Sequence, residues 1–192
     1  MQVFFVDRKK LGVIFVVMGL MISIFCIGIK LDGRIRATAF IQNNLGELKE
    51  YKVDGYEISY KLPGKWENDS GNFSGNEVIY HNNFKSDTDG INGYVQVWSY
   101  NGNLKDFLDM SNNISKDQNK VKNFTVSHID INGNDAYLTE YKINSHGNIY
   151  DAYEYFIKQD SEFIKFSFYI NKNKANPNSE SIFKAIVETV KK

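Results

Sequence analysis

Acidic side chains are the residues of this chain that could do chemistry if the fold brought them together. Two neighbouring carboxyl groups act as acid and base in sugar hydrolysis, and Glu140 with Asp151 or Glu154 could form such a pair. No nucleophile elbow, zinc-binding H-E-x-x-H motif or glycine-rich phosphate loop accompanies them. We therefore expect no enzymatic activity and no catalytic residue, and a hydrolase is our third hypothesis.

Metal ligands occur without the spacing that a metal site needs. Asp87, Asp89 and Gly90 resemble the start of a calcium loop, but Lys85 and Gln96 occupy its first and closing ligand positions. None of the three histidines has a second ligand three or four residues away on an expected helix. The single cysteine lies in an apolar segment, so a thiolate metal site elsewhere is excluded. No metal and no cofactor is expected.

Aromatic side chains form the remaining candidate site. Tyr94, Trp98 and Tyr100 share one face of an alternating run and could contact an unknown protein partner. Aromatic residues at alternating strand positions are more often packed in a core, and the pattern favours that second interpretation. We therefore treat these three residues as possible partner-binding residues and expect a substitution of Trp98 to separate the two interpretations.

Composition and charge narrow the class of partner. Apolar residues make up 42% of the chain and aromatic residues 15%, which is ample material for one core. The net charge is zero, but residues 1–36 hold six basic and two acidic side chains, so the rest of the chain is acidic. All three arginines lie at or before Arg36. The body therefore has no guanidinium group for phosphate, and nucleic acid is not expected as a partner.

An apolar segment near the N-terminus predicts a membrane anchor. Leu11 to Ile29 contains 19 residues without a charged side chain, which is long enough to cross the hydrocarbon layer as a helix. A cleaved signal peptide would have a shorter apolar region that ends at small residues, and Phe25 before Cys26 disfavours lipid attachment. We expect an uncleaved transmembrane helix whose partner is the lipid bilayer.

Basic residues flank this segment on both sides in equal number, so the positive-inside rule hardly favours one membrane orientation over the other. The N-terminal basic residues directly abut the segment, and large domains cross a membrane largely regardless of charge. We therefore predict a single-pass cell-membrane protein whose C-terminal domain lies outside. Its predicted parts are a cytoplasmic head (1–10), a transmembrane helix (11–29), a tether (30–52) and an extracytoplasmic domain (53–192).

Period-two alternation and turn residues predict an α+β domain. Strands are expected at 56–60, 94–100, 126–131, 136–143, 149–157 and 163–170. Asn132 and Gly133 indicate a hairpin between the third and fourth of these strands. Helices are expected from Asn103, ending before Lys116, and from Pro177 to the C-terminus. After the first strand, the order is strand, helix, four strands, helix.

Tyr56, Ile58, Tyr60, Pro63 and Trp66 form the pattern Y-x-I-x-Y-x-x-P-x-x-W. Together with the element order, this pattern resembles the PsbP-like group over residues 53 to 192. The resemblance implies an α/β/α sandwich with a central antiparallel sheet, here preceded by one N-terminal transmembrane helix. That group includes an extrinsic photosystem subunit and a Ran-binding import factor, which are binding modules, and none of its functional residues maps onto this chain.

Our leading functional hypothesis is a bacterial, membrane-anchored, extracytoplasmic domain that is non-catalytic and binds an unknown ligand or assists a partner. The alternative is a membrane-bound regulator or envelope sensor. A head of about ten residues is too short for a folded signalling domain, so such a sensor would act through a membrane partner. The hydrolase hypothesis would require the two-carboxylate cleft described above.

Overall fold

The computed structural model describes residues 18, 47–71, 77–100, 102–117, 121–175 and 177–192. The chain forms two compact units, 1–40 and 41–192, and nearly all of the described residues belong to the second. Within the first unit, Met18 is helical and exposed. Among the described residues, no helix has the length and hydropathy needed to cross a membrane. The rest of the predicted transmembrane segment 11–29 lies outside the described residues.

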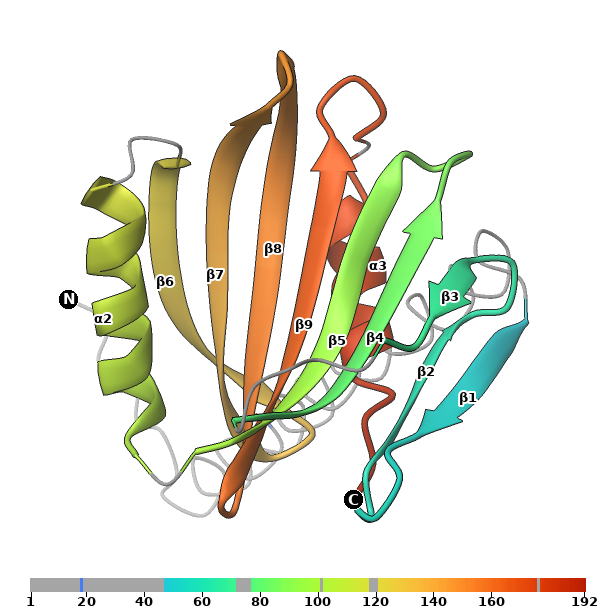
Figure 1. Ribbon diagram of the computed structural model, residues 1–192, viewed down its shortest axis with the longest axis vertical. Coiled ribbons are helices and arrows are strands. Elements are labelled where there is room, and N and C mark those ends of the chain that lie inside the picture. The colour runs from blue at the N-terminus through green and yellow to red at the C-terminus, as the bar shows by residue number, and fades with distance from the viewer. Residues whose placement is uncertain (1–17, 19–46, 72–76, 101, 118–120, 176) are drawn as a thin grey trace, which may run out of the picture. The chain divides into compact units, whose positions relative to one another are not determined.

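A seven-stranded antiparallel sheet is the centre of the second unit (Figure 1). A separate two-stranded sheet precedes it and pairs β1 (Leu48–Lys52) with β2 (Ser59–Pro63). The spatial order of the main sheet, from one edge to the other, is β3 (Glu67–Asp69), β4 (Val78–Ser86), β5 (Ile91–Ser99), β9 (Glu162–Asn171), β8 (Asn148–Gln159), β7 (Asn134–Ser145) and β6 (Val121–Ile131).

One face of the main sheet forms the larger core beneath helix α3 (Ser179–Val187). Successive side chains of a strand point to opposite faces, so the apolar alternation of β9 places Phe166 and Phe168 on this side. Phe183 of α3 stacks on Phe168 with ring centroids 4.4 Å apart. Because α3 buries its apolar stripe here, this contact fixes the helix on the sheet.

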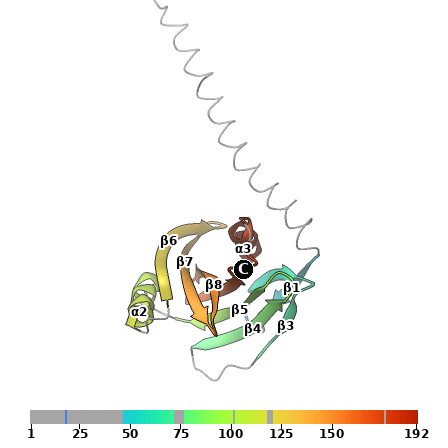
Figure 2. The same ribbon diagram turned by 90° about the horizontal axis from the view of Figure 1, so that it is seen from above.

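The opposite face is partly covered by helix α2 (Leu104–Asp117). The Asn103 side chain accepts a hydrogen bond from the Lys105 backbone amide at 2.8 Å, which caps the helix as predicted. Leu104 and Leu108 then pack against Phe156 and Phe163 of the sheet in a second, smaller cluster. The two helices therefore lie on opposite faces of the sheet, as Figure 2 shows.

The predicted α+β class with a central antiparallel sheet is confirmed, as are the later strands and both helices. Asn132 and Gly133 turn the β6–β7 hairpin with φ angles of 55° and 84°, as that dipeptide predicts. Helix α3 ends at Val187 instead of running to the C-terminus, and the short strand β3 was not predicted. Three further features differ. Strand β2 lies at 59–63 instead of 56–60. Strand β4 was not predicted, because polar residues and a register shift near Tyr80 interrupt its alternation of apolar and polar side chains. Strand β1 lies within the predicted tether, so the folded part begins before Val53.

Candidate functional site

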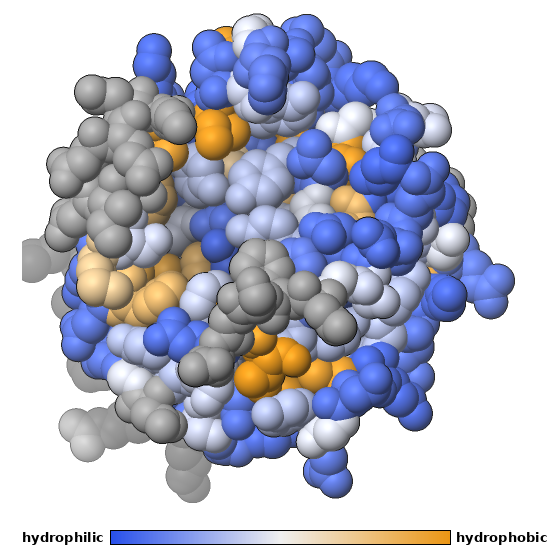
Figure 3. All heavy atoms as spheres, in the orientation of Figure 1, coloured by the Kyte–Doolittle hydropathy of each residue, from blue (hydrophilic) through white to orange (hydrophobic). Residues whose placement is uncertain are grey.

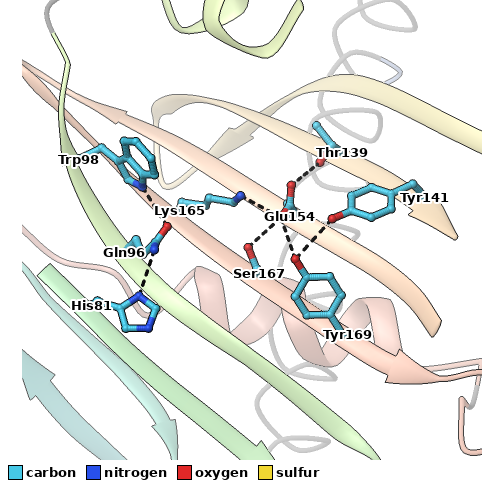
Figure 4. Close-up of polar contacts among 9 residues, drawn as sticks. All are labelled: His81, Gln96, Trp98, Thr139, Tyr141, Glu154, Lys165, Ser167 and Tyr169. Atoms are coloured by element: carbon cyan, nitrogen blue, oxygen red, sulfur yellow. Dashed lines mark hydrogen bonds and ion pairs between the residues drawn. The ribbon is translucent and has the colours of Figure 1, made fainter. Parts of the chain in front are cut away.

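A polar cluster occupies the face of the main sheet that points away from α3, beside the area covered by α2 (Figure 4). Tyr94, Tyr141 and Tyr169 are its half-buried members, and we call these three residues the tyrosine face. They come from β5, β7 and β9 and surround a buried carboxylate, Glu154 of β8.

Cross-strand register explains why these groups meet. Glu154 is paired with Thr139 on one side and Ser167 on the other, and Lys165 lies diagonally across from it on β9. Ala152 sits between Tyr141 and Tyr169 in the neighbouring row. Because its side chain is small, the two tyrosine hydroxyls approach to 3.4 Å.

Glu154 is the centre of the hydrogen-bond network. Its carboxylate lies 2.9 Å from the Lys165 ammonium and accepts hydrogen bonds from Ser167 at 3.0 Å and Tyr169 at 3.2 Å. Burial alone would raise the pKa of Glu154, but Lys165 and these hydrogen bonds outweigh that effect and lower the pKa. The carboxylate is therefore charged at neutral pH, and its Oε1 atom meets all three of these donors.

The other charged and phenolic groups of the cluster are held in their usual protonation states. Burial would lower the pKa of Lys165, but Glu154 outweighs it and the pKa is raised. The Lys165 ammonium also lies 5.4 Å from the centre of the Tyr94 ring, a cation–π distance. Burial, followed by the charge of Glu154, raises the pKa of both Tyr141 and Tyr169. The two tyrosines thus remain hydrogen-bond donors at neutral pH.

A separate hydrogen-bonded chain of side chains lies beside this cluster, where Gln96 pairs with Lys165 across β5 and β9, and it leads toward β4. Trp98 Nε1 donates to Gln96 Oε1 at 3.0 Å, which orients the Gln96 amide. Gln96 Nε2 then donates to His81 Nδ1 at 3.0 Å, so the proton of a neutral His81 belongs on Nε2. His81 Nε2 in turn donates to Asn83 Oδ1 at 2.9 Å.

The three aromatic residues predicted from the sequence as a partner-binding group do not form one surface. Trp98 stacks on Phe163 with ring centroids 5.8 Å apart, and Tyr100 packs edge-on against Phe107 of α2 at 5.3 Å. Both residues thus belong to the cluster under α2. Tyr94 lies apart from them, 6.3 Å from Tyr169 between ring centroids. Partner binding by these three residues stays a prediction.

The carboxylates considered for hydrolysis are also separated. Glu140 faces Tyr153, whose ring packs on Phe183 of α3, so Glu140 lies on the α3 side of the sheet. Glu154 lies on the other side, and the sheet stands between the two carboxylates. Asp151 shares the α3 side but forms an ion pair with Lys142. The pair of Glu140 with Glu154 therefore cannot line one cleft.

The other titratable residues weighed from the sequence have local partners. Asp89 accepts a hydrogen bond from Ser86 at 2.7 Å and lies 3.5 Å from Lys65, as in an ordinary acidic turn. His128 pairs with Asp135. Within the described ranges, no group of three or more histidine, cysteine, aspartate or glutamate side chains could hold a metal ion.

Sequence reasoning missed Lys165, Tyr141 and Tyr169 as site residues. One signal was available, because Lys165 and Ser167 interrupt an otherwise aromatic and aliphatic strand that runs from Phe163 to Ile170. A lysine at such a position is buried only when it has a counter-charge. The identity of that counter-charge, Glu154, depends on the pairing of β8 with β9.

No protein-family model matches the sequence, and no curated protein is significantly similar to it. The fold is similar to the solution structure of cyanobacterial PsbP (CyanoP) from Synechocystis sp. PCC 6803, with a TM-score of 0.57 and 14% identity over 75% of this chain and 91% of that chain. A crystal structure from Bacteroides thetaiotaomicron has a TM-score of 0.52 and 16% identity over 74% of this chain and 47% of that chain.

A third solved structure, LpqN from Mycobacterium tuberculosis, described as involved in cell envelope biogenesis, has a TM-score of 0.45 and 13% identity over 79% of this chain and 93% of that chain. At such low identities the first two likenesses show the fold alone. The chain has a PsbP-like fold, as the sequence resemblance implied, and membership of that family does not follow from it.

Proposed function

We propose that this chain is a non-catalytic accessory domain that binds a partner through the tyrosine face, anchored to the outer side of a bacterial membrane by Leu11–Ile29. The observation that carries the proposal is the arrangement of Tyr94, Tyr141 and Tyr169 around the Glu154–Lys165 ion pair.

Half-buried tyrosines suit recognition because each offers a broad apolar ring and a hydroxyl group. Tyrosine is enriched at protein interfaces for this reason and loses little side-chain entropy on binding. Here Tyr141 is held in place by a hydrogen bond to Tyr169, and Tyr169 in turn donates to Glu154. A surface that is ordered before binding has a smaller entropic cost on association.

The hydropathy of this side of the molecule favours a polar, reversible contact. Figure 3 shows apolar side chains in small separate groups among hydrophilic ones, without one continuous apolar patch on its coloured part. Large apolar patches are typical of permanent interfaces, whereas accessory contacts are more polar. The binding proposal therefore concerns a partner that associates and dissociates.

Two further features support the absence of catalysis. Three donors already occupy the Oε1 atom of Glu154, and the lowered pKa of this carboxyl group makes it poorly suited to act as a general acid or base near neutral pH. Lys165 is charged and paired, so it is not a nucleophile. These side chains preorganise a surface instead of activating a bond.

The anchor and the orientation rest on the sequence, through the 19 uncharged residues from Leu11 to Ile29 and the adjoining basic residues. An envelope regulator that acts through a membrane partner is the second candidate. The same basic residues outside the membrane favour it, since they could contact such a partner near the bilayer surface.

Site-specific photocrosslinking in the cells that produce the full chain tests the binding proposal. A photoreactive phenylalanine analogue is placed at Tyr94 or Tyr141, and at the exposed Tyr56 as a matched control. We expect a reproducible crosslinked product from the first two positions that is missing from the third. Equal products from all three positions, or none from Tyr94 and Tyr141 in variants that melt like the wild type, would contradict the proposal.

A further inference from the structure

A second group of polar side chains lies on the α3 side of the sheet, away from the tyrosine face. Glu140 on β7 faces Tyr153 on β8, and the ring of Tyr153 packs against Phe183 of α3 at 5.4 Å between centroids. Glu180 lies one helical turn before Phe183. The charges of Glu140 and Glu180 act on both Tyr153 and Tyr155, and we call these four residues the acidic cluster.

The negative charge of the acidic cluster has no counter-charge within the described residues. No lysine there forms an ion pair with Glu140 or Glu180, and the nearby Lys142 is bound to Asp151. Lys184 follows Glu180 by one turn without pairing with it. Burial, followed by the charge of Glu180, raises the pKa of Glu140. Glu140 is thus half-buried, and the exposed Glu180 on α3 repels its charge.

The hydroxyl group of Tyr155 is the independent observation that points to a ligand. Tyr155 is only 1% exposed, and its hydroxyl has no hydrogen-bond partner in the part of the chain that the structure describes. It lies on the same side of the sheet as Glu140 and diagonally from it, since Tyr155 pairs with Leu138. Buried hydroxyl groups nearly always have a partner, so an unpaired one beside uncompensated carboxylates indicates a missing group.

We propose that the acidic cluster binds a primary ammonium group, such as that of a lysine side chain or a small amine. The ammonium donates hydrogen bonds to Glu140 and Glu180 and to the Tyr155 oxygen, and its charge offsets both carboxylates. The ring of Tyr153 adds a cation–π contact at the outer, half-buried end. A metal ion fits less well, since no set of three metal-ligating side chains lies among the described residues.

This site is separate from the tyrosine face, because the sheet lies between them. It would recognise a positively charged group, whichever partner contacts the other face. If partner binding by the tyrosine face is disproved, ammonium binding by the acidic cluster is unaffected, and the reverse also holds. Variants on the two faces of the sheet test the two proposals separately.

NMR titration of the full chain in a non-ionic detergent tests the proposal, with ¹³C labels on glutamate carboxyl and tyrosine ring carbons. The probe is n-butylammonium, with tetramethylammonium and sodium ions as controls at the same ionic strength. We expect saturable shifts of Glu140 and Tyr155 with n-butylammonium only. Glu140→Gln should weaken binding by about tenfold or more, since it removes a charged acceptor. Glu50→Gln on β1 removes an exposed charge elsewhere and should not change the affinity.

Tyr155→Phe tests the contribution of the unpaired hydroxyl group to binding, since it removes that group and keeps the ring. It should weaken n-butylammonium binding several-fold and leave the melting temperature unchanged or higher. A lower melting temperature would mean that the hydroxyl has a protein partner, and would overturn the proposal. Equal shifts with tetramethylammonium, or wild-type affinity in Glu140→Gln, would also overturn it. A capped lysine that binds more tightly than n-butylammonium supports a polypeptide ligand, and equal affinity supports a free amine.

Discussion

The carboxylate of Glu154 lies 2.9 Å from the ammonium of Lys165 on the middle strands of the sheet, with side chains only 10% and 16% exposed. Neither charge could stay buried without the other, because desolvation of a lone ion costs several kcal/mol. The pair nevertheless holds Ser167, Tyr169 and Thr139 in one network. Its role is to fix the tyrosine face, and this role has measurable consequences.

Removing one partner of this pair should destabilise the chain strongly. We expect Lys165→Met to lower the free energy of unfolding by about 3 to 5 kcal/mol at pH 7, because Glu154 is left buried without a counter-charge. The double substitution Lys165→Met with Glu154→Gln should recover part of that loss. Urea unfolding of the four proteins of this cycle gives the coupling. Strictly additive effects would mean that the two charges do not interact.

Acid should weaken the contribution of Glu154 to stability. Its pKa in the folded state is lowered, so the folded state binds the proton less tightly than the unfolded state. The contribution is therefore full above the unfolded pKa of about 4.3 and is lost as the pH falls through the lower folded pKa. The stability difference between the wild type and Glu154→Gln should shrink below about pH 4, as followed by thermal melts. A constant difference would contradict this assignment.

Trp98 should behave as a structural residue. Its ring stacks on Phe163 and contacts Phe107 of α2 at 5.9 Å. We expect Trp98→Ala to cost about 3 kcal/mol, because the cavity loosens the helix and Gln96 loses a donor. Trp98→Phe keeps the stack and should cost less. Denaturant unfolding measures both, and an unchanged midpoint for Trp98→Ala would assign Trp98 to the surface instead.

Gly93 should not tolerate a side chain, because neighbouring atoms already fill the space. A Cβ atom there would lie 1.9 Å from the Ser167 carbonyl oxygen and 2.6 Å from the Phe84 ring. We expect Gly93→Ala to destabilise the chain by several kcal/mol through separation of β5 from β9. The control is Gly133→Ala, which meets no atom within 4 Å and should cost about 1 kcal/mol for its φ of 84°. Similar melting temperatures for the two variants would refute this packing argument.

The anchor is tested by fractionation and protease treatment of the full chain. We expect it to stay in the membrane fraction after an alkaline wash, and added protease to digest the domain in intact, wall-stripped cells. A variant with lysine in place of Val16 and Met21 should leave the membrane fraction, because two charges near the middle of the apolar segment oppose insertion. Protection of the domain until lysis would place it in the cytoplasm.

The sequence by itself determined the later strands, the helices and the β6–β7 hairpin. These features depend on local interactions, namely the alternation of apolar residues, the Asn103 cap and the turn preference of Asn132 with Gly133. Strand β4 escaped prediction because its register shift breaks the alternation. Local patterns therefore determined which elements form, without determining which residues they bring together.

Only the tertiary structure decided the two candidate sites. Strand β9 lies between β5 and β8, so Gln96 and Phe156, about sixty residues apart in sequence, both become neighbours of Lys165. The same pairing placed Glu154 on the face opposite α3 and Glu140 on the face beneath it. Strand order and register are set by packing of the whole sheet against α2 and α3, and no local pattern encodes a contact between such distant residues.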